Sequence, residues 1–303
     1  MIGWSAHQVH HSSQDFNLTI GIRQSLFQKL FSAPFYFPLA LLGIPPSLFL
    51  THLGISAVHQ LWIHTELIDG ISPVYDFFFN VPKHHQLHHG TNKYCIDRNY
   101  GGVLIIWDRI YGTFTEKQEH EDEPIAYGLV YGSETYEFSY LQLRYYKFLL
   151  EEIRKEKTLQ EMLIRIYIYV AKGPSYNPKK PKYRTGDKAD YPDGYPKYGL
   201  YDPKITLKNI IAGVVLVSKA YFVTDYFLLS DHPKNPWLFC GALLYCTLTT
   251  VCVCELSSGQ KSSLRKFHQT LGIVFFLSLS LIFTSSKLVF ACYVFCFMHL
   301  ILQ

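Results

Sequence analysis

Charge is scarce in this sequence. Charged residues make up 17% of the 303 residues, against about 25% in ordinary globular domains, whereas hydrophobic residues reach 49% and aromatic residues 16%. This profile favours a membrane protein with aromatic side chains at the bilayer interface over a cytosolic enzyme. The net charge of +4 suits contact with anionic lipid headgroups. It is too small to indicate nucleic-acid binding, and no basic patch with interleaved aromatics accompanies it.

Sequence signals of other protein classes are also missing. The seven cysteines show neither a disulfide framework nor zinc-knuckle spacing, since Cys252 and Cys254 form a C-x-C and not a C-x-x-C. All except Cys95 lie in apolar C-terminal runs, where a cysteine usually behaves as a small hydrophobic residue. The N-terminal residues lack the basic region of a secretory signal peptide, and no internal repeat is visible. These absences argue against a disulfide-stabilised secreted domain.

Long apolar runs predict membrane segments. Leu26–Ile63 contains one charged residue, Lys29, and is long enough for two spans of about 20 residues. The break at 43–46 and the prolines of this run predict a kinked or re-entrant hairpin, with a pair of buried helices in a soluble core as the alternative. Further candidate spans are Ile210–Leu229, Pro236–Cys254 and Leu271–Leu302.

The runs divide the chain into three parts. We predict an all-α fold with a histidine-bearing domain over 1–150, a linker over 151–205 and a C-terminal transmembrane helical region over 206–303. Residues 172–204 are rich in Pro, Tyr, Lys and Asp. This composition cannot build a packed core and indicates an extended, solvated segment.

Histidine is concentrated where charge is scarce, since ten of the 14 histidines fall in the first 89 residues. Two stretches, at 7–11 and 85–89, each read H-x-x-H-H. On a helix, positions i, i+3 and i+4 share a face, so each stretch would direct three imidazoles to one point. Two such helices can enclose a metal pair, and imidazole suits iron, zinc and copper. A lone histidine on an apolar face would more often be a core residue; two copies of this pattern predict a metal site.

A third contribution lies in the stretch VHQLWIHTE, residues 58–66. A histidine near the end of a membrane span is costly unless it has a partner or lines a polar cavity, so we expect His64 to face the same metal site. His59 stays open between a ligand, a hydrogen-bond donor to a ligand and an interfacial residue. Glu66 is a candidate contact to a cofactor or to the metal. The predicted metal ligands are His7, His10, His11, His64, His85, His88 and His89, with His59 in reserve.

The surroundings of the second stretch suggest supporting roles. His84 points to a different face from His85 and would support the site indirectly. Because a ligating imidazole usually donates its other N–H to a carboxylate or carbonyl, Asp97 and Asp108 are candidate partners, with a plain turn as the alternative. The run Trp107–Asp108–Arg109 and the pair Asn99–Tyr100 are expected to brace the histidines through hydrogen bonds.

These motifs carry a family resemblance. The stretches AHQVHHSSQDFNLTIGIRQS, QLWIHTELI and HHQLHHGTNKYCIDRNYGGVLIIWDRIYGTF resemble the fatty acid hydroxylase and sterol desaturase superfamily of integral-membrane di-iron oxygenases. The run N-Y-G-G-x-L-x-x-W-D-x-x-x-G-T-F after the last histidines is typical of that superfamily. The resemblance covers residues from about 4 to 130, and beyond the linker it is only a matter of general hydropathy.

The resemblance is strongest to the members of the superfamily that cleave ether lipids, and it implies a specific reaction. Such an enzyme uses two irons, O2 and tetrahydrobiopterin to hydroxylate the alkyl carbon beside the ether oxygen of alkylglycerols and lyso-ether lipids. The hemiacetal then collapses to a fatty aldehyde and a glycerol backbone. The resemblance also implies a multi-pass protein of the endoplasmic reticulum membrane, and it indicates no obligate protein partner.

One departure from the family pattern leaves alternatives open. The superfamily has a further H-x-x-x-H box before the first H-x-x-H-H, yet only six residues precede His7. Two irons need on the order of eight protein ligands, so we expect an N-terminally truncated sequence. The alternatives are a sterol or fatty-acid hydroxylase or desaturase of the same superfamily, fed by cytochrome b5, and a catalytically inactive membrane protein with an incomplete metal site.

Overall fold

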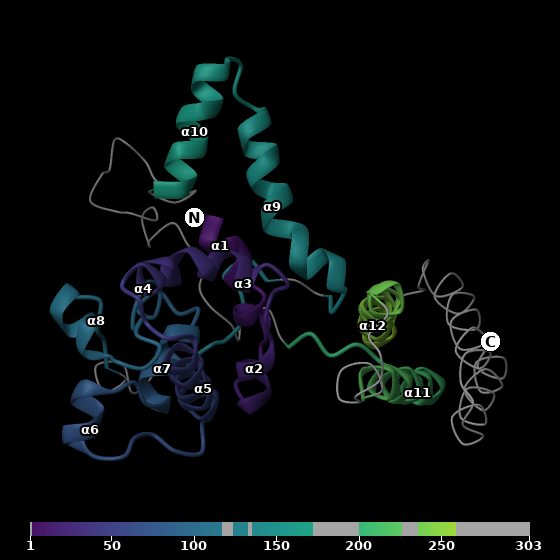
Figure 1. Ribbon diagram of the computed structural model, residues 1–303, viewed down its shortest axis with the longest axis horizontal. Helices are drawn as coiled ribbons and strands as arrows, with labels where there is room; N and C mark the ends of the chain where they lie inside the picture. Colours follow the sequence, from purple (N-terminus) through teal and green to yellow (C-terminus); the bar gives the residue numbers. More distant parts are fainter. Residues whose placement is uncertain (1, 117–123, 133–134, 172–199, 226–235, 259–303) are drawn as a thin grey trace. The chain divides into compact units, whose positions relative to one another are not determined.

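The chain is described from a computed structural model that covers 2–116, 124–132, 135–171, 200–225 and 236–258 (Figure 1). Within these residues the secondary structure is helical and contains no strand, and an isolated β-bridge joins Gly90 to Tyr127. The prediction of an all-α chain is therefore confirmed for the described residues. The chain divides into two compact units, Met1–Glu134 with Gln142–Tyr201 and Thr135–Leu141 with Asp202–Gln303.

The first unit contains the short helices that carry the histidines. Its elements are α1 (Ile2–His7), η1 (His10–Ser12), α2 (Leu18–Ile22), α3 (Gln28–Ser32), η2 (Ala33–Tyr36), α4 (Phe37–Leu41), α5 (Pro46–Trp62), α6 (Pro73–Phe78), α7 (Pro82–His89), α8 (Ile106–Tyr111), most of α9 (Phe138–Arg154) and α10 (Leu159–Ala171). One helix through 7–11, as the spacing predicts, is wrong: α1 ends at His7, and η1 resumes with 3-10 geometry at His10. The prediction of a helix through 85–89 is confirmed by α7.

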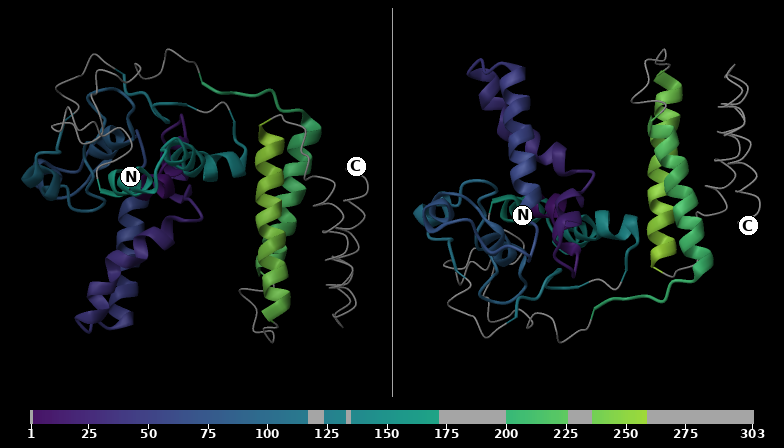
Figure 2. Two further views of the ribbon diagram at one scale, coloured as in Figure 1. Left: turned by 90° about the horizontal axis from the view of Figure 1, so that it is seen from above. Right: turned by 90° about the horizontal axis from the view of Figure 1, so that it is seen from below.

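The apolar run at Leu26–Ile63 forms a broken helical hairpin. Its first arm consists of α3, η2 and α4, and α5 is the second arm. The chain reverses at Gly43, whose φ of +70° favours glycine, and Pro46 opens α5 where its missing N–H costs nothing. The break is where the sequence predicts it, and the arms of the hairpin project together in Figure 2.

The alternative of a buried helix pair is not what the structure shows for α5, which contains no buried residue. Apolar side chains of the hairpin are instead exposed, and Phe35 and Leu41 are 82% and 88% accessible. Such an arrangement is unfavourable in water and favourable in hydrocarbon. Membrane crossing by this hairpin stays a prediction.

The segment after α7 is a hydrogen-bonded frame around Asp108. Its carboxylate accepts from the N–H groups of Tyr100 and Gly101 at 2.8 and 2.7 Å and from the hydroxyl of Thr113 at 2.5 Å. Asn99, in the left-handed region at φ 52°, donates from Nδ2 to the carbonyl of His84 at 3.0 Å. The prediction that Asn99 and Asp108 brace the histidine stretch is thereby confirmed.

The second unit contains α11 (Leu207–Thr224) and α12 (Pro236–Ser257), which lie side by side (Figure 2). Ala212 and Leu216 of α11 pack against Cys252 and Leu256 of α12. Among the described residues, one helical segment, Cys240–Ser257, is long and apolar enough to cross a membrane. It overlaps the predicted span Pro236–Cys254, whereas the predicted span Leu271–Leu302 lies outside the described residues.

The predicted division of the chain at 150 and 205 stays a prediction. Helix α10 occupies the first part of the segment 151–205 that we predict as a linker, and 172–199 lie outside the described residues.

Replacing Asp108 with Ala is expected to destabilise the first unit. The change leaves two backbone N–H groups and one hydroxyl without their acceptor, and each orphaned buried donor costs about 1–3 kcal/mol. Thermal unfolding of the detergent-solubilised chain, followed by intrinsic fluorescence, should show a lower Tm for Asp108→Ala. The control Asp15→Ala removes an exposed carboxylate and should unfold with the wild type. Equal Tm values for all three proteins would contradict the role given to Asp108.

Candidate metal centre

Two groups of histidines converge inside the first unit. His10, His64, His85 and His89 form a buried tetrad, and His7, His11 and His88 form a second group beside it; the ligand atoms in each group lie within 4.8 Å of one another. The His11 and His89 rings stack at 4.1 Å between centroids, so the groups adjoin. The donor set consists of imidazoles from α1, η1, α7 and the end of α5, which is suited to borderline metals such as iron, zinc and copper.

Hydrogen bonds at the outer edge of the rings determine their tautomers. Nδ1 of His10 donates to the carbonyl of Ile20 at 2.9 Å, and Nδ1 of His64 donates to the carbonyl of Gln60 at 2.6 Å. In a neutral imidazole the other nitrogen then carries a lone pair. The Nε2 atoms of His10 and His64 nevertheless face each other at 3.2 Å. Two lone pairs at that distance repel unless a cation lies between them.

The residues therefore fit a bound metal. In the tetrad, Nε2 of His85 lies 2.9 Å from Nε2 of His64 and 3.2 Å from Nε2 of His89. A tetrahedral metal with nitrogen ligands at about 2.0–2.1 Å holds those nitrogens about 3.4 Å apart, which is close to this spacing. Donation from the outer nitrogen of a ligating imidazole to a carbonyl is also the usual arrangement at metal sites.

The second group has the same features with one ligand fewer. Nδ1 of His88 donates to the carbonyl of Arg98 at 3.1 Å, which leaves its Nε2 free to bind. Nδ1 of His7 and Nε2 of His11 are buried and have no hydrogen-bond partner. Unpartnered buried nitrogens are costly in a protein interior, and coordination to a metal would satisfy both.

Burial keeps these imidazoles neutral, as metal binding requires. Desolvation, with repulsion from neighbouring histidines, lowers the pKa of His7 to about 4 and that of His11, His85 and His89 well below the ordinary 6.5. Desolvation also lowers the pKa of His64 to about 4, against the opposing hydrogen bond to Gln60. The cluster therefore stays uncharged at neutral pH.

Three sets of contacts from the surrounding chain hold the histidine cluster in place. Gln86 of α7 donates from Nε2 to the carbonyl of Thr65 at 3.0 Å, which fixes α7 beside the end of α5. Thr91 and Asn92 hold the segment 124–126 through hydrogen bonds of 2.7–3.0 Å. The buried ring of Phe16 stacks on His64, and an edge-on contact of 5.3 Å joins it to His89.

All seven histidines that we predict as ligands are brought together by the structure; their binding of metal stays a prediction. His59 lies outside both groups and donates from Nε2 to the carbonyl of Asn80 at 3.1 Å. The His84 ring also lies outside and packs edge-on against Phe114 at 5.2 Å. Glu66 is exposed and accepts a hydrogen bond of 2.8 Å from the hydroxyl of Tyr127. A contact from Glu66 to a cofactor stays a prediction.

Neither candidate carboxylate orients an imidazole. Asp108 accepts from the frame after α7, as described above, and Asp97 accepts from the hydroxyl of Tyr100 at 2.8 Å. Backbone carbonyls of Ile20, Gln60 and Arg98 fill that role for His10, His64 and His88 instead. Trp107 is half exposed, whereas Arg109 braces α8 by donating to the carbonyl of Phe77 at 3.1 Å.

Sequence reasoning missed the aromatic wall of the cluster. Phe16 stacks on Tyr127 at 4.9 Å, and the hydroxyl of Tyr127 reaches Glu66, so three distant segments meet beside the tetrad. Burial, with the neighbouring carboxylate of Glu66, raises the pKa of Tyr127. The position of Phe16 five residues after His11 was a weak signal, and nothing local marked Tyr127.

Comparisons with known proteins match this part of the chain. The family model described as fatty acid hydroxylase matches residues 2–113. An alkylglycerol monooxygenase of Danio rerio is 40% identical over 228 residues, which are 75% of this chain and 46% of that protein. Those of Xenopus tropicalis and Homo sapiens are 42% and 43% identical over 67% and 60% of this chain, and 43% and 38% of their own lengths.

The chain thus spans less than half the length of the curated relatives it matches. No solved structure matches it. The family resemblance that the sequence motifs indicate is confirmed by the family model and by these relatives.

The metal-free chain is expected to lose stability as the pH falls from about 6.5 to 4. Unfolded histidines take up protons below 6.5, whereas those of the folded cluster, with pKa values of about 4 for His7 and His64, do not. The unfolded state therefore binds more protons in this window, and stability falls with falling pH. Chelator-treated chain should show a declining Tm in scans from pH 7.5 to 4. A flat Tm would show that the histidines are not buried as described.

The chain is expected to bind two equivalents of Co2+, one for each group of histidines. His85→Ala removes a buried ligand of the tetrad and should lower the stoichiometry by at least one equivalent. The control His52→Ala changes an exposed histidine on α5 and should bind as the wild type. Equilibrium dialysis with metal analysis measures the stoichiometry, and visible absorption reports ligand geometry. Unchanged binding by His85→Ala would refute the tetrad.

Proposed function

Because the chain carries a fatty acid hydroxylase domain over residues 2–113 and is homologous to the alkylglycerol monooxygenases, we propose that it is a membrane di-iron monooxygenase acting on ether lipids. The proposed reaction uses O2 and tetrahydrobiopterin to cleave the O-alkyl bond of alkylglycerols and lyso-ether lipids, with release of a fatty aldehyde. We further propose a multi-pass location in the endoplasmic reticulum membrane.

The observation that carries this proposal is the pair of adjoining histidine groups inside the hydroxylase domain. Seven clustered imidazoles, five buried and two half-buried, without a carboxylate among them would be costly in a metal-free core, since polar groups there need partners. With iron bound, the centre and the pterin would supply O2 activation and the electrons for the reaction. The donor set and the inward-facing nitrogens are what such a centre requires of the chain.

The protein's own residues would position the substrate. Helices α2 and α5 approach closely beside His64, since a Cβ on Gly21 would lie 2.8 Å from Cδ1 of Leu61 and 3.3 Å from Nδ1 of His64. Next to this contact, Leu18 and Ile22 are exposed. An alkyl tail can follow this apolar surface toward the histidines while the glycerol hydroxyls stay near water.

Burial of the histidines serves the same chemistry. The tetrad residues are at most 7% exposed, so bulk water is kept from the place where the alkyl carbon would react. The Nδ1 hydrogen bonds of His10, His64 and His88 fix the rings, which limits the reorganisation needed during a reaction.

Two alternative functions can be separated from this proposal by experiment. A sterol or fatty-acid hydroxylase or desaturase would share the histidine groups and would take electrons from cytochrome b5. A catalytically inactive membrane protein would bind one zinc or no metal. Metal content separates the second alternative from the proposal, and the electron donor with the substrate separates the first.

The iron-loaded chain in detergent is expected to release a fatty aldehyde from an alkylglycerol only when tetrahydrobiopterin and O2 are both present. His85→Ala should reduce aldehyde release by more than 100-fold, or about 2.7 kcal/mol in the barrier, because the tetrad loses a ligand. His52→Ala should retain wild-type activity.

The readouts are aldehyde production and iron content for each chain. Oxidation of a sterol or fatty acid with cytochrome b5, without aldehyde from the ether lipid, would support the first alternative. One zinc or no metal after loading would support the inactive protein.

A further inference from the structure

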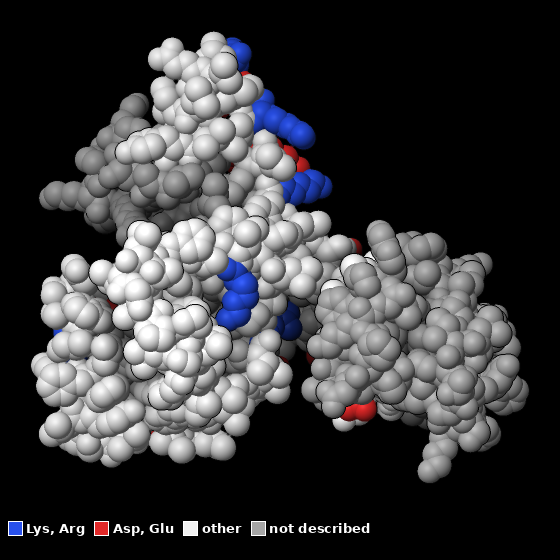
Figure 3. All heavy atoms as spheres, viewed as in Figure 1, with Lys and Arg blue, Asp and Glu red and all other residues white. Residues whose placement is uncertain are grey.

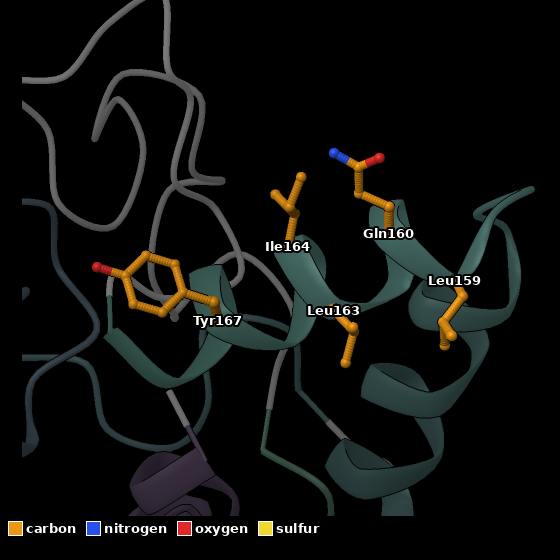
Figure 4. Close-up of a pocket in the computed structure, with 5 residues that line it drawn as sticks. All are labelled: Leu159, Gln160, Leu163, Ile164 and Tyr167. Carbon is orange, nitrogen blue, oxygen red and sulfur yellow. The ribbon is translucent and has the colours of Figure 1, made fainter.

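Helix α10 presents an apolar face to the outside of the first unit. Leu159, Leu163, Ile164 and Tyr167 are 72%, 58%, 51% and 64% exposed. With Gln160 they line a shallow hollow along successive turns of the helix (Figure 4). Exposed apolar side chains that gather on one element indicate an interaction surface.

The residues of α10 are arranged as on an amphipathic helix. Leu159, Leu163 and Tyr167 recur every four residues and so share a face. The opposite face carries Glu161 and Arg165, and the Arg165 guanidinium lies 2.5 Å from the carboxylate of Glu156. The helix is therefore apolar on its outer side and charged on the other.

The helix start is stabilised by a capping box. The backbone N–H of Thr158 donates to Oε2 of Glu161 at 3.0 Å, and the backbone N–H of Glu161 donates to Oγ1 of Thr158 at 3.2 Å. Such reciprocal bonds satisfy two helix-end donors. The helix, and with it the apolar face, thus begins at a defined residue, Leu159, two residues after Lys157.

The side-chain charges next to the apolar face that no ion pair or helix cap neutralises are positive. The glutamates of the hairpin formed by α9 and α10 are engaged, Glu161 in the cap and the others in the pairs Lys147–Glu151, Lys155–Glu152 and Arg165–Glu156. Within the described part of the chain, Arg154 and Lys157 make no ion pair. Figure 3 shows Lys and Arg gathered at the tip and along one side of this hairpin.

We propose that α10 lies along the surface of a lipid bilayer that contains anionic phospholipids. The side chains of Leu159, Leu163 and Ile164 enter the acyl region, and Arg154 and Lys157 contact phosphate-bearing headgroups. Amphipathic helices with a basic border bind bilayers in this way, and the Tyr167 ring with its hydroxyl suits the interface. The proposal does not depend on the reaction proposed above.

A second copy of the chain fits this surface less well. A two-fold dimer builds its interface from the same patch of both copies, so the cations Arg154 and Lys157 would enter that interface twice. Like charges brought together cost free energy, whereas anionic headgroups remove that cost. Charge complementarity therefore favours the bilayer.

Site-specific photocrosslinking of the full chain in lipid nanodiscs tests the proposal. A photoreactive p-benzoylphenylalanine replaces Leu163 on the apolar face or, as the matched control, Arg165 on the opposite face. Mass spectrometry then identifies the adducts. We expect several-fold more lipid adduct at position 163 than at 165, and a higher yield with phosphatidylserine than with phosphatidylcholine alone.

Charge variants separate the two parts of the proposal. The double variant Arg154→Glu with Lys157→Glu should abolish the increase in lipid adduct that phosphatidylserine causes. The charge-conserving variant Arg154→Lys with Lys157→Arg should keep that increase. Circular dichroism checks that each variant is folded. Equal lipid yields at the two positions, or crosslinks from 163 to a second copy, would overturn the proposal. Lipid adducts at 163 without a phosphatidylserine effect would overturn the role of Arg154 and Lys157. None of these readouts uses enzymatic activity.

Discussion

The structure depends on one constraint, that seven clustered imidazoles, five of them buried and two half-buried, turn ring nitrogens toward one another. The Nε2 lone pairs of His10 and His64 repel in that arrangement, and burial, which lowers the pKa of both rings, prevents protonation from relieving the repulsion. Backbone carbonyls of Ile20, Gln60 and Arg98 hold the outer nitrogens. The protein thus fixes, in His10, His64 and His88, a tautomer that suits a ring facing a cation, so metal binding as proposed would stabilise the first unit.

Much of the remaining fold can be understood as support for that arrangement. The helices that carry the histidines are short, and few large apolar side chains besides Leu87 are buried on them, so hydrophobic packing alone does not fix the rings. Rigidity comes instead from polar frames: Asp108 and Asn99 hold the segment after α7, and Gln86 connects α7 to the end of α5. These frames hold the rings through contacts that do not involve the exposed apolar side chains of the hairpin.

A feature of this protein can be predicted from the sequence where a local pattern encodes it, and cannot where it depends on contacts between distant segments. The H-x-x-H-H spacing, the end of α5 at Trp62 and the break near Gly43 are local patterns, so they predict which histidines converge and where the hairpin turns. The geometry at 7–11 departs from one helix because Ser12 and Arg23 bond the carbonyl of Val9, a contact that spacing does not reveal. The meeting of Phe16, Tyr127 and Glu66 joins segments up to 111 residues apart, and no local pattern encodes it.

The proposed reaction at the histidine centre and the proposed bilayer contact of α10 both restrict where the first unit lies relative to the lipid headgroups. In an alkylglycerol the carbon beside the ether oxygen is separated from the glycerol hydroxyls by only a few bonds. If the centre oxidises that carbon, as proposed above, it must lie near headgroup level and not in the middle of the bilayer. Helix α10 contacts α1, whose last residue is His7. An α10 that lies in the bilayer surface would hold α1, and the second group of histidines with it, close to that level.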